Sequence, residues 1–187
     1  MYAKRSSEPA HRFVGELARL YEERGARWYG SEPVTQLEHA LQCAALAEAD
    51  GASCELVVAS LLHDVGHLAP EADETGSADD LHEYRAFHTL RRYFGAPVLE
   101  PIRMHVTAKR YLCAVLPGYS ETLTPASRRS LELQGGTCTL DEARTFIEVA
   151  YACDAVQLRL WNDRAKVPGK RTPGFEHYAD LLLRCAL

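Results

Sequence analysis

Residues 54–68, with the sequence CELVVASLLHDVGHL, indicate the fold most clearly. This stretch consists mainly of Val, Leu and Ala at helical spacing, as in a helix buried on all sides. One adjacent polar pair, His63 and Asp64, interrupts the apolar run. A charged Asp is costly to bury in such surroundings unless a partner neutralises it, and a metal ion does this well. The stretch therefore predicts a buried helix that carries a metal-binding pair.

The rest of the chain also has helical periodicity, and strand-like alternation is hard to find, so we expect an all-α fold. Capping boxes at Thr35-x-x-Glu38, Asp80-x-x-Glu83 and Thr139-x-x-Glu142 open three of the helices. The last of these helices is expected to be long and to run towards Trp161. Thr124-Pro125 has the pattern of an N-cap followed by Pro at the first helical position.

The length of 187 residues suits one domain with a single sizeable core. We find no internal repeat, low-complexity tract or linker composition. The acidic stretch from Pro70 to Asp80 has the composition of an exposed loop. We therefore expect a single domain over residues 1–187, with its core at about 28–169 and a short C-terminal helix at 175–187.

Composition excludes several classes of protein. The net charge of −5 argues against a general nucleic-acid binder, although a local basic site for a small anion remains possible. The longest apolar run, Leu56 to Leu62, is too short to span a bilayer, and polar residues follow the N-terminal Met1–Arg5 instead of a signal-peptide core. We expect a cytoplasmic protein that acts on a small molecule, as a monomer or small homo-oligomer.

The six cysteines are scattered, and no two of them form a C-x-x-C pair. In a reducing cytoplasm this distribution favours small buried hydrophobic residues over a disulfide framework or a zinc-thiolate site. They are Cys43, Cys54, Cys113, Cys138, Cys153 and Cys185.

Further histidines share the apolar surroundings of His63 and Asp64. His67 lies one helical turn after His63, and His39 lies among Ala and Leu on the preceding helix. A lone core histidine is more often a structural residue than a ligand, but three in phase beside an Asp favour a metal site. Downstream, His82 and His105 supply further candidates. His88, in a polar helix, and the terminal His11 and His177 are expected at the surface.

The order of these residues resembles the HD-domain superfamily, and the additional His82 and His105 suit its two-metal members. Three later segments are more specific: HVTAKRYLCAVLP, SRRSLELQGG and VQLRLWNDRAKVPG. Together they resemble the HD-domain mixed-valent diiron oxygenases of the PhnZ/TmpB type, relatives of myo-inositol oxygenase. The resemblance extends from about Trp28 to Gly169.

This resemblance implies an O2-dependent cleavage of the C–P bond of a 1-hydroxyphosphonate at an Fe(II)/Fe(III) pair. A 2-amino substrate would give phosphate and glycine, and its trimethylammonio analogue would give glycine betaine. An aromatic cage would favour the quaternary ammonium, but the sequence does not show which aromatic residues line it. The carboxylate and imidazole donors suit iron.

The resemblance also implies roles for individual residues. The iron ligands would be His39, His63, Asp64, His82 and His105, with Asp64 bridging. In the resting enzyme, Tyr29 would occupy an iron position and bond Glu32, and substrate would displace it. The phosphonate would bind His67, Lys109, Ser127, Ser130, Gln134 and Arg159.

The last metal ligand is open. The family has an Asp near the end of its last long helix, where this chain has Trp161-Asn162-Asp163. Alignment favours Asn162, which would bind through its carbonyl oxygen. Chemistry favours Asp163, which lies about 100° further round the helix. Asp154 is a weaker third candidate.

Two other functions fit parts of the pattern. An HD phosphohydrolase would use the same histidines to activate a metal-bound water. A non-catalytic HD module that binds a ligand or a partner helix would be consistent with the loss of an Asp ligand at Asn162. The Tyr29 and Glu32 loop and the AKRYLC and QGG segments favour the oxygenase over the hydrolase. The intact set of His39, His63, Asp64, His82 and His105 argues against the non-catalytic module.

Overall fold

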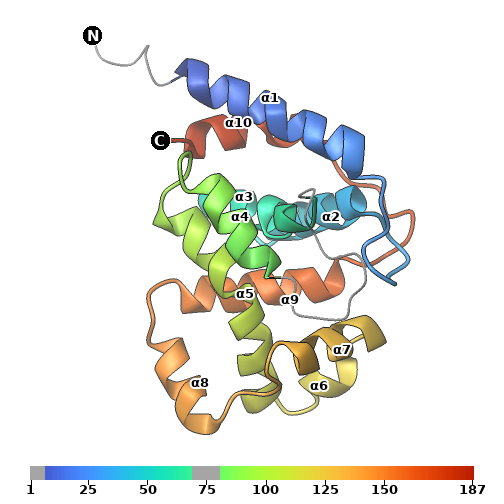
Figure 1. The fold of residues 1–187 in the computed structure, drawn as a ribbon, viewed down its shortest axis with the longest axis vertical. Helices are drawn as coiled ribbons and strands as arrows, with labels where there is room; N and C mark the ends of the chain where they lie inside the picture. The colour runs from blue at the N-terminus through green and yellow to red at the C-terminus, as the bar shows by residue number, and fades with distance from the viewer. Residues whose placement is uncertain (1–6, 69–80) are drawn as a thin grey trace.

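The computed structural model describes residues 7–68 and 81–187 (Figure 1). Within these ranges the chain forms ten α-helices and one 3-10 helix but no strand, which confirms the expected all-α fold. The helices are α1 (Ser7–Arg24), α2 (Gln36–Ala49), α3 (Cys54–Leu62), η1 (Val65–Leu68), α4 (His82–Leu90), α5 (Ala96–Val115), α6 (Tyr119–Thr122), α7 (Pro125–Leu133), α8 (Leu140–Ile147), α9 (Ala152–Arg164) and α10 (Phe175–Cys185). The expected loop at 70–80 with its cap Asp80, and the N-terminal Met1–Arg5, lie outside the described residues.

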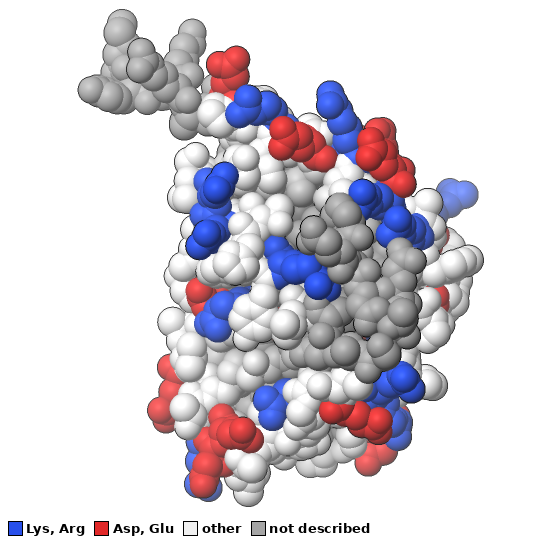
Figure 2. Space-filling view, viewed as in Figure 1, with Lys and Arg blue, Asp and Glu red and all other residues white. Residues whose placement is uncertain are grey.

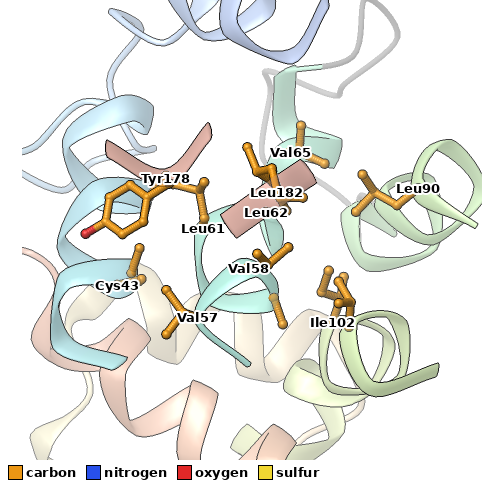
Figure 3. Packing of buried hydrophobic residues seen from close by; sticks show 14 of the residues in the cluster. Cys43, Val57, Val58, Leu61, Leu62, Val65, Leu90, Ile102, Tyr178 and Leu182 are labelled. Carbon is orange, nitrogen blue, oxygen red and sulfur yellow. The ribbon is translucent and has the colours of Figure 1, made fainter. Parts of the chain in front are cut away.

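Helix α3 forms the centre of the molecule, as its sequence predicts. It packs against α2, α5, α9 and α10, and its residues from Leu56 to Leu62 are buried. Figure 3 shows Val57, Val58 and Leu61 among side chains from the surrounding helices. Burial of each such aliphatic side chain contributes about 1.5–3 kcal/mol to folding.

The remaining helices lie on two sides of this centre. Helices α1 and α10 pack together at one end of the molecule, and α6, α7 and α8 lie at the other (Figure 1). Helices α5 and α9 pack closely on each other between these ends. The site described below therefore lies on helices that belong to the core.

The helix expected through residues 54–68 is interrupted at the polar pair. Helix α3 ends at Leu62, His63 is its C-cap, and η1 begins at Val65. Gly66 explains the tight packing of η1 on α4, because a Cβ at this position would lie 2.0 Å from the carbonyl oxygen of His82. The break turns Asp64 out of the helix and towards the histidines.

The prediction of one long helix from Thr139 towards Trp161 is wrong. Its capping box is present, but α8 ends at Ile147 and α9 begins at Ala152. Tyr151 adopts the left-handed conformation with φ of 66° between the two helices. The separate direction of α9 lets it pack along α5 and α2. Tertiary packing thus overrides the local helical pattern.

The expectation that the cysteines are buried holds only for Cys43 and Cys138. Cys54 and Cys153 are exposed, and all six cysteines are free. Acidic and basic side chains are interspersed on the face seen in Figure 2. Within residues 7–68 and 81–187, no helix combines the length and apolar content that a membrane crossing requires.

Candidate functional site

Four histidines from four different places in the fold converge at the centre. His39 comes from α2, His63 caps α3, His82 opens α4 and His105 lies within α5, and all four are buried. The Nε2 atoms of His39 and His63 are 3.4 Å apart. Those of His82 and His105 are 3.0 Å apart. The site thus contains two histidine pairs.

Asp64 lies between these pairs. Its Oδ2 atom is 3.5 Å from Nε2 of His39 and 3.1 Å from Nε2 of His63. Its Oδ1 atom is 3.3 Å from Nε2 of His82 and 3.6 Å from Nε2 of His105. One carboxylate oxygen therefore faces each pair, which is the arrangement of a bridging ligand.

The position of the proton on three of these histidine rings follows from the contacts of their Nδ1 atoms. The Nδ1 atoms of His39, His63 and His105 lie 2.8, 2.9 and 2.7 Å from the backbone carbonyls of Ala165, Ser60 and Ile102. A carbonyl oxygen can only accept, so each Nδ1 carries the hydrogen and each Nε2 directs a lone pair into the cluster. Burial lowers the pKa of His39 and His105, which favours their neutral forms.

These residues fit a metal. Both Asp64 oxygens are buried without a hydrogen-bond donor in the part of the chain that the structure describes. A buried carboxylate among imidazole lone pairs needs a cation, and this donor set suits iron or manganese.

The structure places Asn162 and Asp163 in different surroundings. Asn162 is buried, its amide nitrogen is 2.8 Å from Nε2 of His63, and its Oδ1 atom has no described donor. Exchange of the amide's nitrogen and oxygen would turn the oxygen towards the His39 and His63 pair. Asp163 instead binds Arg159 and accepts a hydrogen bond from Tyr119. No described contact brings Asp154 to the cluster.

Two further side chains lie beside the histidine pairs. Cys43 Sγ is 3.6 Å from Nε2 of His39. The atoms of Cys43, His39 and His63 that could bind a metal all lie within 4.8 Å of one another. On the other side, the possible metal-binding atoms of His67, Asp64 and His82 also lie within 4.8 Å of one another. The His67 ring stacks on the His82 ring, with 4.1 Å between their centres. The expected surface histidines His11, His88 and His177 are all exposed.

The loop between α1 and α2 reaches this centre. A β-bridge between Trp28 and Thr35 closes the loop, and the Tyr29 ring stacks on His39 at 3.9 Å. Burial and the charge of Asp64 raise the pKa of Tyr29 well above its usual range. The side chain of Glu32 accepts hydrogen bonds from Lys166 and Thr124, while its backbone N–H donates to the Tyr29 carbonyl.

Three cations lie close to one another near Tyr29, and we call Lys109, Arg159 and Lys166 the cation cluster. Arg159 is paired with Asp163, and Lys166 with Glu32 at 2.9 Å. Lys109, whose Nζ donates to Ser130 Oγ at 2.7 Å, has no carboxylate partner among the described residues. Burial, with the charges of Arg159 and Lys166, lowers its pKa to about 7.

Two of the three neutral residues expected around the phosphonate, Ser127 and Ser130, contact these cations. Ser127 Oγ accepts a hydrogen bond from Lys166, and Ser130 Oγ donates to the Ser127 carbonyl. Gln134 caps α7 and has a buried Oε1 atom without a described partner. The structure thus brings the expected histidines together around Asp64, and it brings Ser127 and Ser130 into contact with the cation cluster. No described contact joins the Gln134 side chain to either group.

Comparison with known proteins identifies the family. No model of a known protein family matches the chain. A hydroxymethylphosphonate dioxygenase of Gimesia maris is 45% identical over 92% of this chain and 87% of its own length. A glycine-betaine-forming [1-hydroxy-2-(trimethylamino)ethyl]phosphonate dioxygenase of Leisingera caerulea is 36% identical over 92% of this chain and 88% of its own. The chain belongs to the phosphonate dioxygenase family.

Membership in this phosphonate dioxygenase family confirms the expected oxygenase class over the hydrolase and the non-catalytic module. A dioxygenase requires O2 and a group that activates it, and the His and Asp cluster can hold a metal for this purpose. A third relative, an uncharacterized protein of Acanthamoeba polyphaga mimivirus, is 32% identical over 91% of this chain.

Sequence reasoning missed part of this dioxygenase's site. Lys166, Thr124 and Tyr119 were not among the candidates, yet each binds a residue that was. The sequence offers one indication that Lys166 belongs to the site: it follows Asn162 by four residues, which is about one helical turn. The contact of Lys166 with Glu32 spans 134 positions and depends on the tertiary fold.

Proposed function

We propose that the chain uses O2 to cleave the C–P bond of a small 1-hydroxyphosphonate at a mixed-valent pair of iron ions. Two observations carry this proposal: the Asp64 carboxylate is buried between two histidine pairs, and the buried Lys109 has no carboxylate partner among the described residues. The first feature requires cations and the second requires an anion. A phosphonate at a metal centre meets both requirements.

The residues of the central cluster would hold the two iron ions. His39, His63 and Asn162 would hold one iron, His82 and His105 the other, and Asp64 would bridge them. The bound iron pair would supply Lewis acidity and the activation of O2. Asn162 is preferred to Asp163 because it contacts His63, whereas Asp163 is engaged by Arg159.

The phosphonate would bind where its charge is matched. Lys109 would hold it through a charge-assisted hydrogen bond, with Ser127, Ser130 and Gln134 as neutral partners. His67, stacked on His82, would contact the substrate at the metal side. Arg159 would add positive charge while Asp163 and Tyr119 fix its position.

Tyr29 and Glu32 would control access. Tyr29 covers His39, so a substrate that reaches the His39 and His63 pair must move the ring. Glu32 would hold the loop in place through Lys166 and Thr124. Their positions at the edge of the metal centre support this role.

The reaction balances without a further reductant. Hydroxymethylphosphonate and O2 would give formate and phosphate, with one oxygen atom added to carbon and one to phosphorus. We propose this substrate first, since the relative at 45% identity is named for it. The trimethylammonio substrate of the relative at 36% identity is the second candidate.

Product analysis tests the choice of substrate. Iron-loaded protein would be incubated under air with each phosphonate, and formate, glycine betaine and phosphate would be measured. We expect formate and phosphate in equal amounts from hydroxymethylphosphonate, with a larger kcat/KM than for the trimethylammonio compound. Iron analysis should give two ions per chain with a mixed-valent spectroscopic signal. Zinc-dependent release of phosphate without carbon oxidation would contradict the proposal.

A further inference from the structure

Lys166 is held firmly although it lies beyond the end of α9. On one side of it, the Ala165 carbonyl binds His39. On the other side, both backbone groups of Val167 bind the side chain of Gln42, at 2.9 and 3.1 Å. The Lys166 side chain is only 8% exposed. A buried ammonium on so constrained a backbone has a defined position and few alternative partners.

Lys166 and Lys109 meet the same helix. Lys166 Nζ donates to Ser127 Oγ at 2.8 Å, and Lys109 Nζ donates to Ser130 Oγ at 2.7 Å. These serines are three residues apart on α7 and therefore lie on one face of it. The two ammonium groups and two hydroxyls together offer donors for several oxygens of one tetrahedral dianion.

Lys166 also contacts the loop that covers the metal centre. It donates to Glu32 Oε1 at 2.9 Å, and its Nζ lies 5.8 Å from the centre of the Tyr29 ring. The Tyr29 ring in turn stacks on His39. Lys166 therefore connects the serine face of α7 with the loop.

We infer that Lys166 is a phosphonate-binding residue and that it transmits anion binding to the Tyr29 and Glu32 loop. This inference rests on the proposed function, because it requires that the site takes a phosphonate. A dianion beside Ser127 competes with Glu32 for the Lys166 ammonium. Loss of that ion pair leaves Glu32 with Thr124 and loosens the loop over His39.

Binding and loop movement can be measured without turnover. Iron-loaded protein would be titrated without O2, by calorimetry, with hydroxymethylphosphonate and with inorganic phosphate. Trp28, 66% exposed and adjacent to Tyr29, reports on the loop by fluorescence, while the second tryptophan, Trp161, is buried on Asp50. We expect both anions to bind the wild-type protein and to change the Trp28 emission.

The variants separate the two roles of Lys166. Loss of a charge-assisted hydrogen bond predicts that Lys166→Met lowers affinity for both anions about 10- to 100-fold. At saturation the variant should also lack the Trp28 response. Lys109→Met should lower affinity but keep that response, since Lys109 does not contact the loop. Arg164→Met removes an exposed cation two residues away and should bind within about twofold of wild type.

A second variant protects the test against misfolding. Lys166→Met leaves the buried Glu32 without a cationic partner, so the double variant with Glu32→Gln would be measured beside it. Wild-type affinity in both variants, or an unchanged Trp28 response at saturation, would overturn the inference while leaving the proposed function intact. Failure of the wild-type protein to bind either anion would overturn both.

Discussion

Asn162 and Asp163 show how much depends on a single residue of helical register. Successive side chains on a helix point about 100° apart. Asn162 consequently faces His63, while Asp163 faces Arg159 and Tyr119. The sequence could not resolve this choice, since a carboxylate is the better metal ligand and only the packing of α9 shows which side chain is turned inward.

Paired substitutions test this assignment. Asn162→Ala removes a polar group beside His63, and we expect the affinity for iron to fall at least about tenfold. Asp163→Asn should leave the iron content near that of wild type and raise KM, because Arg159 loses its ionic partner. Iron would be determined by elemental analysis after dialysis against a weak chelator. Iron loss in Asp163→Asn but not in Asn162→Ala would reverse the assignment.

The lowered pKa of Lys109 predicts that KM depends on pH. Its pKa is lowered from 10.5 to about 7 by burial and by neighbouring cations, so the free enzyme loses the Lys109 charge as the pH rises through 7. Only the protonated form attracts a dianion strongly, and we therefore expect KM for the phosphonate to increase above pH 7. Lys109→Arg stays charged throughout and should show a weaker increase. Equal pH profiles of KM for the two proteins would show that Lys109 is not the responsible group.

At the scale of elements, the sequence predicted helices better than their ends. The Thr35 and Thr139 capping boxes and the Thr124 cap are present as expected, because they depend on local hydrogen bonds. The breaks after Leu62 and Ile147 were not predicted. Neither is marked by proline or glycine at the break itself, and both are stabilised by contacts with distant helices.

The site shows the same contrast between residues that local sequence patterns predict and residues that only tertiary packing brings together. The group of His39, His63, Asp64 and His67 could be selected from helical spacing and apolar surroundings. In the cation cluster, Lys109 and Arg159 were named only through the family resemblance and Lys166 was missed, because the three residues meet only after α5 and α9 have packed. Read alone, the Lys109-Arg110 pair has the appearance of solvated charge, yet Lys109 is buried.

Gly66 links the packing of elements to the site. A Cβ there would lie 2.0 Å from the His82 carbonyl oxygen, so Gly66→Ala must separate η1 from α4 and displace His82. We expect a loss of about 1–3 kcal/mol in unfolding free energy, together with weaker iron binding. Urea denaturation and iron analysis measure the two effects.

Gly15→Ala is the matched control for this prediction. Gly15 lies in α1 with no atom within 4 Å of an added Cβ. The change should stabilise the protein by up to about 1 kcal/mol, because Ala is the better helix former. Equal effects of the two substitutions would contradict the role given to Gly66.

For the whole molecule, folding places a buried carboxylate and four imidazoles at one point, and only metal binding satisfies them all. Metal that binds the folded chain alone should raise its unfolding free energy by about 2.7 kcal/mol at a free concentration 100-fold above Kd. Removal of iron with a chelator should therefore lower Tm, and added iron should restore it. Asp64→Asn, with one charge fewer between the histidine pairs, should show a smaller change. A Tm that does not respond to chelation of iron-loaded protein would contradict this account.

The central claim is that O2 is consumed as the C–P bond breaks. The most direct measurement follows O2 uptake and phosphate release together in iron-loaded protein supplied with hydroxymethylphosphonate. The account predicts one O2 consumed for each phosphate released, and no phosphate when O2 is excluded. Phosphate release that continues at the same rate without O2 would contradict it.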